Sequence, residues 1–154
     1  MRAPSVDWRP SEKYRFLLRS DFTLTLPEDW HGHWLFYENG KCLATMLDSS
    51  MTIYAGFSWD GCSPSQLFGI KWLSAPSPAS TIVGSLYHDL FYQFVGVRGC
   101  PWDRRCADDE LRSLLRGNSF PAADLYYYAV RLFGGNFVQA KQGAARDPRI
   151  LSCI

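Results

Sequence analysis

The sequence predicts an α+β domain in which an N-terminal antiparallel sheet is followed by a C-terminal bundle of about three helices. Residues 14–57 contain short segments rich in aromatic and β-branched side chains, separated by sequences typical of turns. Residues 80–135 instead carry apolar residues at helical spacing, interrupted by glycine and proline. The order of these two patterns places the strands first and the helices afterwards.

The length and composition of the chain favour one domain with a hydrophobic core. The chain has 154 residues, of which 47% are hydrophobic, and domains commonly contain about 100 to 150 residues. We therefore expect a single domain over 1–154. Its parts are mainly strands in 1–57, a functional loop in 58–80, a helical part in 81–140 and a tail in 141–154.

Five strands are expected in the first third of the chain. The turn between the third and fourth strands contains Asn39-Gly40, a pair that readily adopts the positive φ angles of a tight hairpin. Another turn is expected at "LPED". In order, the strand segments are "YRFLL", "FTLTL", "HWLFYEN", "CLATML" and "MTIYAGF".

The first helix is expected at about 80–94, after a loop dense in glycine, proline and serine. Ser80 can serve as its N-cap. Apolar residues then follow helical spacing in "STIVGSLYHDLFYQF", at Ile82, Leu86, Tyr87 and Phe91.

Two further helices are expected after a stretch that contains glycine and proline. The second helix, "CADDELRSLLRGN", has Gly117 as its terminator. The third helix, "FPAADLYYYAVRLFGG", begins close to Pro121 and ends at the glycine pair of residues 134–135.

Charge and cysteine content exclude several classes of function. Sixteen basic and fifteen acidic residues leave a formal charge of +1, so nucleic acid is not an expected partner. We expect neither a signal peptide nor a membrane span, because no segment is apolar enough over the required length. The five cysteines lack C-x-x-C spacing and are expected to be free thiols, although Cys100 and Cys106 flank a short loop and could pair.

The first predicted helix carries two adjacent ionisable residues, His88 and Asp89, in otherwise apolar surroundings. Asp89 and Tyr92 share one face of the helix, and His88 lies one turn before Tyr92. Burying an unpaired charge is costly, so these side chains require partners. The sequence offers Asp108 or Asp109 on the second helix, and Asp60 in the preceding loop.

These residue types can form a hydrolytic site. A carboxylate of Asp108 against one ring nitrogen of His88 would fix the tautomer and leave the other nitrogen as a base. Asp60 and Asp89 could then bind a hard cation together with loop carbonyls such as that of Gly61. The pattern therefore indicates metal-assisted hydrolysis.

Three motifs together resemble an uncharacterised domain family of bacteriophages and prophages. They are "WDGCSPS", "YHDLFY" and "RRCADDELRSLL", which match a D-G-x-S-x-P loop, an H-D-x-x-Y helix and an A-D helix. The resemblance extends over about 14–135. It implies a phage or prophage origin, a location in the host cytoplasm or the virion, and other phage proteins as partners.

The same motifs are similar, more distantly, to the site of bacterial secreted phospholipase A2. The resemblance implies that His88 is the base that activates water and that Asp108 is the carboxylate that orients His88. It also implies that Tyr92 supports the pair of His88 and Asp108. It also implies calcium bound by Asp60 and Asp89, and a lipid or other ester as substrate. The chain differs from that class in opening with predicted strands and in having no cysteine in the His88 helix.

Two alternatives remain at the level of sequence. His88 and Asp89 could belong to a non-catalytic network that locks the loop to the helices of a phage structural or assembly protein. His31 and His33 could instead bind zinc together with His88 or Asp89.

Overall fold

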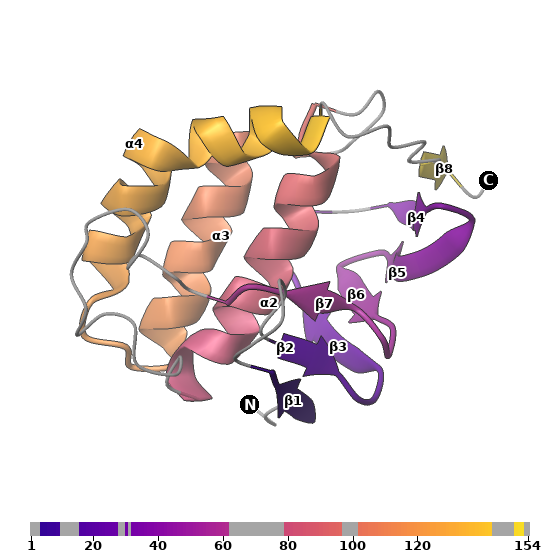
Figure 1. The fold of residues 1–154 in the computed structure, drawn as a ribbon, viewed down its shortest axis with the longest axis horizontal. Helices are drawn as coiled ribbons and strands as arrows, with labels where there is room; N and C mark the ends of the chain where they lie inside the picture. Colours follow the sequence, from indigo (N-terminus) through magenta and orange to yellow (C-terminus); the bar gives the residue numbers. More distant parts are fainter. Residues whose placement is uncertain are drawn as a thin grey trace.

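The computed structural model describes residues 4–9, 16–27, 30, 32–61, 79–96, 102–142 and 150–152. In the described part of the chain, seven strands come first, three helices follow and one short strand comes last, which confirms the predicted α+β class. Figure 1 shows the helices gathered on one side of the molecule and the strands on the other.

The strands form two antiparallel sheets. The smaller sheet has the order β1-β2-β7, and the larger sheet has the order β3-β6-β5-β4-β8. The strands of the smaller sheet are β1 (Val6–Trp8), β2 (Phe16–Leu18) and β7 (Ser58–Trp59). Those of the larger sheet are β3 (Phe22–Thr25), β4 (His33–Glu38), β5 (Lys41–Leu47), β6 (Ser50–Ile53) and β8 (Ile150–Ser152).

The hairpin between β4 and β5 forms as predicted. Asn39 and Gly40 have φ angles of 51° and 76°, which is the left-handed conformation that this kind of turn requires at both central positions. Phe36 and its cross-strand partner Ala44 are fully buried. A register shift between Phe36 and Tyr37 separates this pair from the turn, so the turn sets the pairing of Glu38 with Lys41 and the shift sets that of Phe36 with Ala44.

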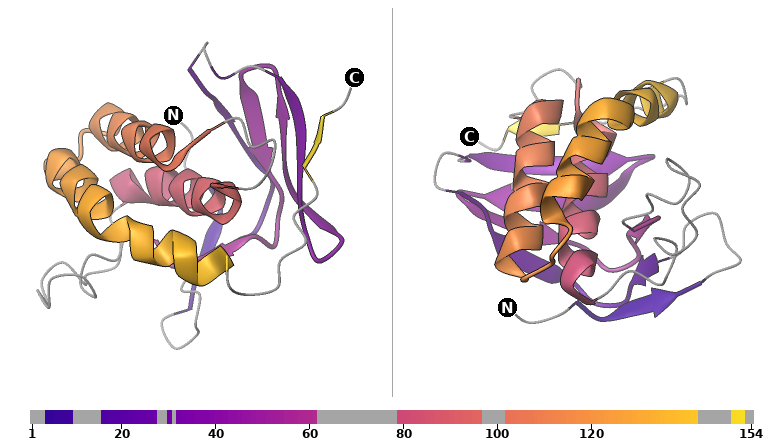
Figure 2. Two further views of the ribbon diagram at one scale, coloured as in Figure 1. Left: turned by 90° about the horizontal axis from the view of Figure 1, so that it is seen from above. Right: turned by 90° about the vertical axis from the view of Figure 1, so that its left-hand side faces the viewer.

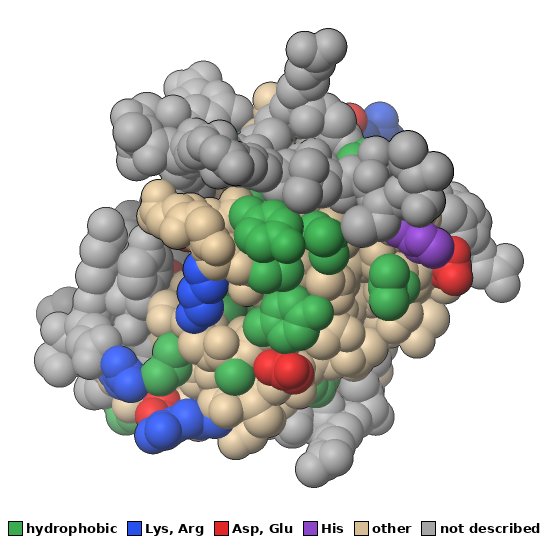
Figure 3. Space-filling view, turned by 90° about the vertical axis from the view of Figure 1, so that its right-hand side faces the viewer, with side chains coloured by type: hydrophobic (Ala, Val, Ile, Leu, Met, Phe, Trp, Pro, Cys, Tyr) green, Lys and Arg blue, Asp and Glu red, His purple; other side chains and the backbone are tan. Residues whose placement is uncertain are grey.

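The opposite face of the larger sheet is more polar. Thr23 Oγ1 lies 2.7 Å from Thr52 Oγ1, and Thr45 Oγ1 lies 3.1 Å from the hydroxyl of Tyr54. Figure 3, seen from the side of the strands, also shows hydrophobic side chains grouped near the middle of this face.

The three helices are α2 (Ala79–Phe94), α3 (Arg104–Gly117) and α4 (Ala123–Gln142). Figure 2 shows α2 between the strands and the other two helices. Its side chains are therefore buried in several directions, and Leu86, Tyr87, Leu90 and Phe91 are inaccessible to solvent. This central position explains why the sequence of α2 is apolar around most of its circumference.

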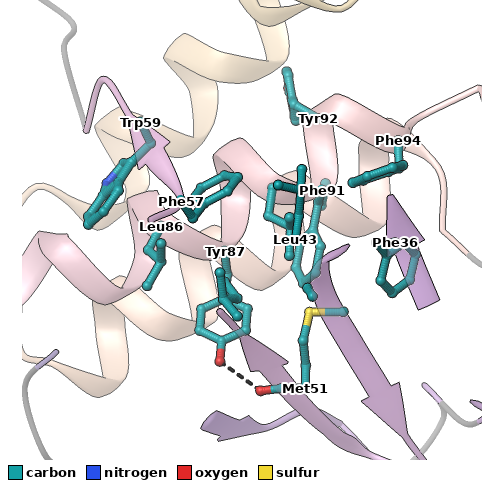
Figure 4. Packing of buried hydrophobic residues seen from close by; sticks show 14 of the residues in the cluster. Phe36, Leu43, Met51, Phe57, Trp59, Leu86, Tyr87, Phe91, Tyr92 and Phe94 are labelled. Carbon is teal, nitrogen blue, oxygen red and sulfur yellow. Dashed lines mark hydrogen bonds between the residues drawn. The ribbon is translucent and has the colours of Figure 1, made fainter. Parts of the chain in front are cut away.

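Helix α2 is anchored to the strands by hydrogen bonds as well as by packing. The hydroxyl of Tyr87 donates to the carbonyl of Met51 at 3.0 Å, and the indole of Trp59 donates to Ser85 Oγ at 3.1 Å. Figure 4 shows Tyr87 directed toward the strands and Tyr92 directed away from them. The two tyrosines therefore lie on opposite sides of α2.

The predicted helix boundaries need three corrections. Helix α2 begins at Ala79, so Ser80 lies within it and is not the N-cap. Helix α3 begins at Arg104, with Asp103 as its N-cap, whose side chain accepts a hydrogen bond from the Cys106 amide at 2.8 Å. The predicted end of the third helix at residues 134–135 is wrong, because α4 continues to Gln142.

The structure also contains strands that the sequence patterns missed. Strand β8 pairs with β4, although the tail shows no clear pattern, and β7 begins the segment predicted as a loop. Most of that loop, residues 62–78, lies outside the described residues. Cys42 and Cys106 are free thiols, as expected. The other three cysteines lie outside the described residues.

Candidate functional site

The structure brings His88 of α2 against Asp108 of α3. Nε2 of His88 lies 3.0 Å from Oδ1 of Asp108, whose side chain is completely buried. Asp109 points elsewhere: its side chain is 49% exposed and lies 3.7 Å from Nε of Arg105. Asp108 is therefore the partner of His88, although both aspartates were candidates from the sequence.

The close approach of α2 and α3 follows from their sequences. Asp108 lies on the apolar stripe of α3, with Leu111 and Leu115 one and two turns further on, and all three are buried. On α2, Gly84 gives these leucines room, because a Cβ at this position would lie 3.2 Å from Cδ1 of Leu111 and 3.3 Å from Cδ2 of Leu115. The packing of Leu111 and Leu115 against Gly84 thus places Asp108 next to His88.

Tyr92, one turn after His88, binds the same carboxylate oxygen. Its hydroxyl donates to Oδ1 of Asp108 at 2.5 Å, and its ring centroid lies 4.1 Å from that of His88. Burial, followed by the nearby Asp108 carboxylate, raises the pKa of Tyr92. The phenol therefore remains a hydrogen-bond donor at neutral pH.

Two arginines that were not predicted as site residues complete the surroundings of Asp108. Nη1 of Arg131, on α4, lies 2.8 Å from Oδ2 of Asp108. Nε of Arg104, one turn before Asp108, lies 3.6 Å from the same oxygen. The i,i+4 spacing of Arg104 and Asp108 is a local signal, whereas nothing in the sequence connects Arg131 with this site.

The pKa shifts indicate that Asp108 is ionised. Burial alone would raise the pKa of Asp108, but hydrogen bonds from His88 and Tyr92 outweigh it, and the net pKa is lowered. Burial would lower the pKa of His88, but the hydrogen bond to Asp108 and the nearby Asp89 carboxylate outweigh it, and the net pKa is raised. Because a carboxylate only accepts hydrogen bonds, Nε2 of His88 carries a hydrogen.

Asp89 lies beside the second ring nitrogen of His88. Nδ1 is 3.7 Å from Oδ1 of Asp89, which is too long for a direct hydrogen bond. Oδ2 of Asp89 accepts a hydrogen bond from the backbone amide of Asp60 at 3.2 Å. The side chain of Asp89 is 20% exposed and that of His88 only 9%, so Asp89 lies closer to solvent.

The predicted calcium ligands fit a hard cation in kind but provide few donors. The backbone amide of Asp60 contacts Asp89, and Gly61 follows with a φ angle of 75°, a left-handed conformation that glycine favours. Calcium takes about six to eight oxygen ligands. In the described part of the chain, no three His, Cys, Asp or Glu side chains are grouped to hold a metal ion.

The two histidines proposed as zinc ligands, His31 and His33, are not seen beside His88. Nε2 of His33 lies 3.2 Å from Oδ1 of Asp48, and both side chains are exposed. A histidine beside an acidic residue is visible at the edge of the face in Figure 3. His31 lies outside the described residues.

No protein-family model, no curated protein and no solved structure matches this chain. Among the described helices, none is both long and apolar enough to cross a membrane. The resemblances to the phage domain family and to phospholipase A2 therefore rest on the sequence motifs.

Proposed function

We propose that this protein is a metal-assisted, calcium-dependent ester hydrolase that uses the pair His88 and Asp108. One observation carries the proposal. The Nε2 atom of His88 is held by a fully buried carboxylate, while Nδ1 lies 3.7 Å from the more exposed Asp89 and has no direct hydrogen bond to the described residues. This orientation leaves Nδ1 as the nitrogen that can accept a proton.

In the proposed reaction, Nδ1 of His88 takes a proton from a water molecule while the water oxygen attacks the ester carbonyl. Asp108 stabilises the resulting imidazolium through Nε2, and Tyr92 keeps the carboxylate in place. When the ester C–O bond breaks, His88 returns the proton to the leaving alcohol oxygen. A calcium ion held by Asp60, Asp89 and the Gly61 carbonyl would stabilise the negative charge on the carbonyl oxygen.

The substrate class and the origin of the protein belong to the same proposal. A lipid ester is the substrate that the likeness to phospholipase A2 supports. The three motifs shared with the phage domain family support a phage or prophage origin, with the protein in the host cytoplasm or the virion. Other phage proteins are then its natural partners.

Calcium binding tests the metal part of the proposal. Titration calorimetry on the chelator-stripped protein should detect a calcium site that disappears in Asp89→Asn. Asp48→Asn is the matched control, because Asp48 is an exposed acid that lies beside His33. Binding that persists in Asp89→Asn would contradict the proposed ligands, and binding of zinc alone would direct attention to His31 and His33.

A second function, as a non-catalytic structural or assembly protein, is favoured by a different observation. The contacts of Asp108 join α2, α3 and α4, and Asp89 joins α2 to the residue that follows β7. Such a network can serve stability alone. In that case His88→Gln would lower the free energy of unfolding, and the parent protein would show no hydrolysis that depends on His88.

A further inference from the structure

Helix α4 supplies a charged contact to the side of Asp108 that faces away from His88. Oδ1 of Asp108 accepts from His88 and Tyr92, whereas Oδ2 lies 2.8 Å from Nη1 of Arg131. The carboxylate is inaccessible to solvent, and the side chain of Arg131 is 33% exposed. Arg131 therefore reaches inward from a partly exposed position to a buried charge.

We propose that Arg131 is a positioning residue of this site, which acts on His88 through Asp108. Its guanidinium fixes Oδ2 and thereby holds Oδ1 in line with Nε2 of His88. It also keeps the buried carboxylate ionised, which the Nε2–H tautomer of His88 requires. This inference rests on the proposed function, because positioning matters only if Nδ1 of His88 acts as a base.

Arg104 supports the contact between Arg131 and Asp108 but does not make this hydrogen bond itself. Its Nη2 donates to the backbone carbonyl of Arg131, so it fixes the chain that carries the Arg131 side chain. Its Nε is 3.6 Å from Oδ2 of Asp108, beyond the usual length of a hydrogen bond. Arg131 therefore makes the direct hydrogen bond, and Arg104 adds electrostatic attraction.

The glycine pair in α4 allows this helix to come close enough. A Cβ at Gly134 would lie 2.6 Å from the hydroxyl of Tyr92, and one at Gly135 would lie 2.6 Å from Nη1 of Arg104. Glycine inside a helix is unfavourable relative to alanine, so the pair has another reason to be there. At Gly134 a larger residue would meet the ring of Tyr92 and push α4 away, whereas at Gly135 it would meet only the end of the Arg104 side chain, which can move.

The ring proton of His88 provides a test that does not depend on turnover. In the full-length protein in calcium-free buffer, NMR should show a slowly exchanging His88 Nε2–H signal. We expect Arg131→Gln to speed its exchange with solvent by at least about tenfold. Arg131→Lys, which keeps the charge, should restore most of the protection.

The matched control is Arg112→Gln. Arg112 also joins α3 to α4, through a hydrogen bond of 2.6 Å from its Nε to Asp124, but this carboxylate is 52% exposed, whereas Asp108 is buried. This substitution should leave the His88 signal unchanged. If Arg131→Gln and Arg112→Gln have the same effect on the signal, Arg131 has no positioning role.

A wild-type measurement decides the matter if Arg131→Gln does not fold. In labelled protein, a scalar coupling across the hydrogen bond from Arg131 Nη1 to the Asp108 carboxyl carbon is expected, and its absence would overturn the inference. A different measurement tests the proposed function, because a wild-type protein without esterase activity would refute hydrolysis. An unchanged His88 signal in folded Arg131→Gln would refute only the role of Arg131.

Discussion

The hydroxyl of Tyr92 donates to Oδ1 of Asp108 at 2.5 Å, on the same oxygen that Nε2 of His88 contacts at 3.0 Å. Tyr92 and His88 are one turn apart on the central helix, so a single carboxylate satisfies both. This relationship explains how a mostly buried helix can carry ionisable residues. It also fixes which nitrogen of His88 is directed toward Asp89.

Removing the Tyr92 hydroxyl should destabilise the protein. We expect Tyr92→Phe to lower the free energy of unfolding by roughly 1–3 kcal/mol, because a buried hydrogen bond to a charged group is lost. Urea denaturation measures this change. Tyr128→Phe is the control, since Tyr128 is 58% exposed; an equal loss in the two variants would contradict the role of the Tyr92 hydroxyl.

Asp108→Asn should have a larger effect than Asp109→Asn. Loss of the Asp108 charge weakens the buried hydrogen bonds from His88 and Tyr92, and a hydrogen bond to a charged group contributes roughly 1.5–3 kcal/mol. Asp109 is 49% exposed in a surface ion pair, whose loss changes stability by about 1 kcal/mol at most. Denaturation of both variants at pH 7 distinguishes them. Similar losses would show that Asp108 does not hold the network together.

Gly134→Ala should destabilise the protein although alanine favours helix formation. The added Cβ would lie 2.6 Å from the hydroxyl and 3.1 Å from Cε1 of Tyr92, and overpacking typically costs about 1–3 kcal/mol. Gly117→Ala is the control, because a Cβ there meets nothing within 4 Å. A thermal-unfolding midpoint that rises in Gly134→Ala would show that α4 does not need this close approach.

The parts of the fold that short stretches of sequence determine could be predicted. Asn39-Gly40 defines its hairpin through backbone preferences alone, and the spacing of apolar residues identifies α2. Strand β8 could not be predicted, because it depends on pairing with the distant β4. The predicted end of α4 at residues 134–135 is wrong because Gly134 and Gly135 lie at a close helix contact and do not terminate the helix.

In the candidate site, too, some residues can be predicted from local sequence and others depend on tertiary packing. His88 and Tyr92 are recognisable from helical spacing, and Asp108 lies on the apolar stripe of its helix. Arg131 lies on a third helix, and only the packing of α4 brings it to Asp108. Its contribution therefore needed the three-dimensional structure.

The lowered pKa of Asp108 makes its contribution to stability depend on pH. Hydrogen bonds and ion pairs hold its folded-state pKa below the value of about 3.9 for an unfolded chain. Its contribution is therefore fully present above about pH 4 and is lost as the pH falls through the folded-state pKa. We expect the difference in unfolding free energy between wild type and Asp108→Asn to shrink over that acidic range. A constant difference down to low pH would contradict this.

The release of fatty acid from phospholipid vesicles tests the hydrolase proposal most directly. The protein should release fatty acid in the presence of calcium, and chelation or His88→Gln should abolish this, while circular dichroism shows that His88→Gln remains folded. Arg112→Gln, away from the site, should retain the activity. Absence of release by the wild-type protein, or release that persists in folded His88→Gln, would contradict the proposal that His88 and Asp108 form a hydrolytic pair.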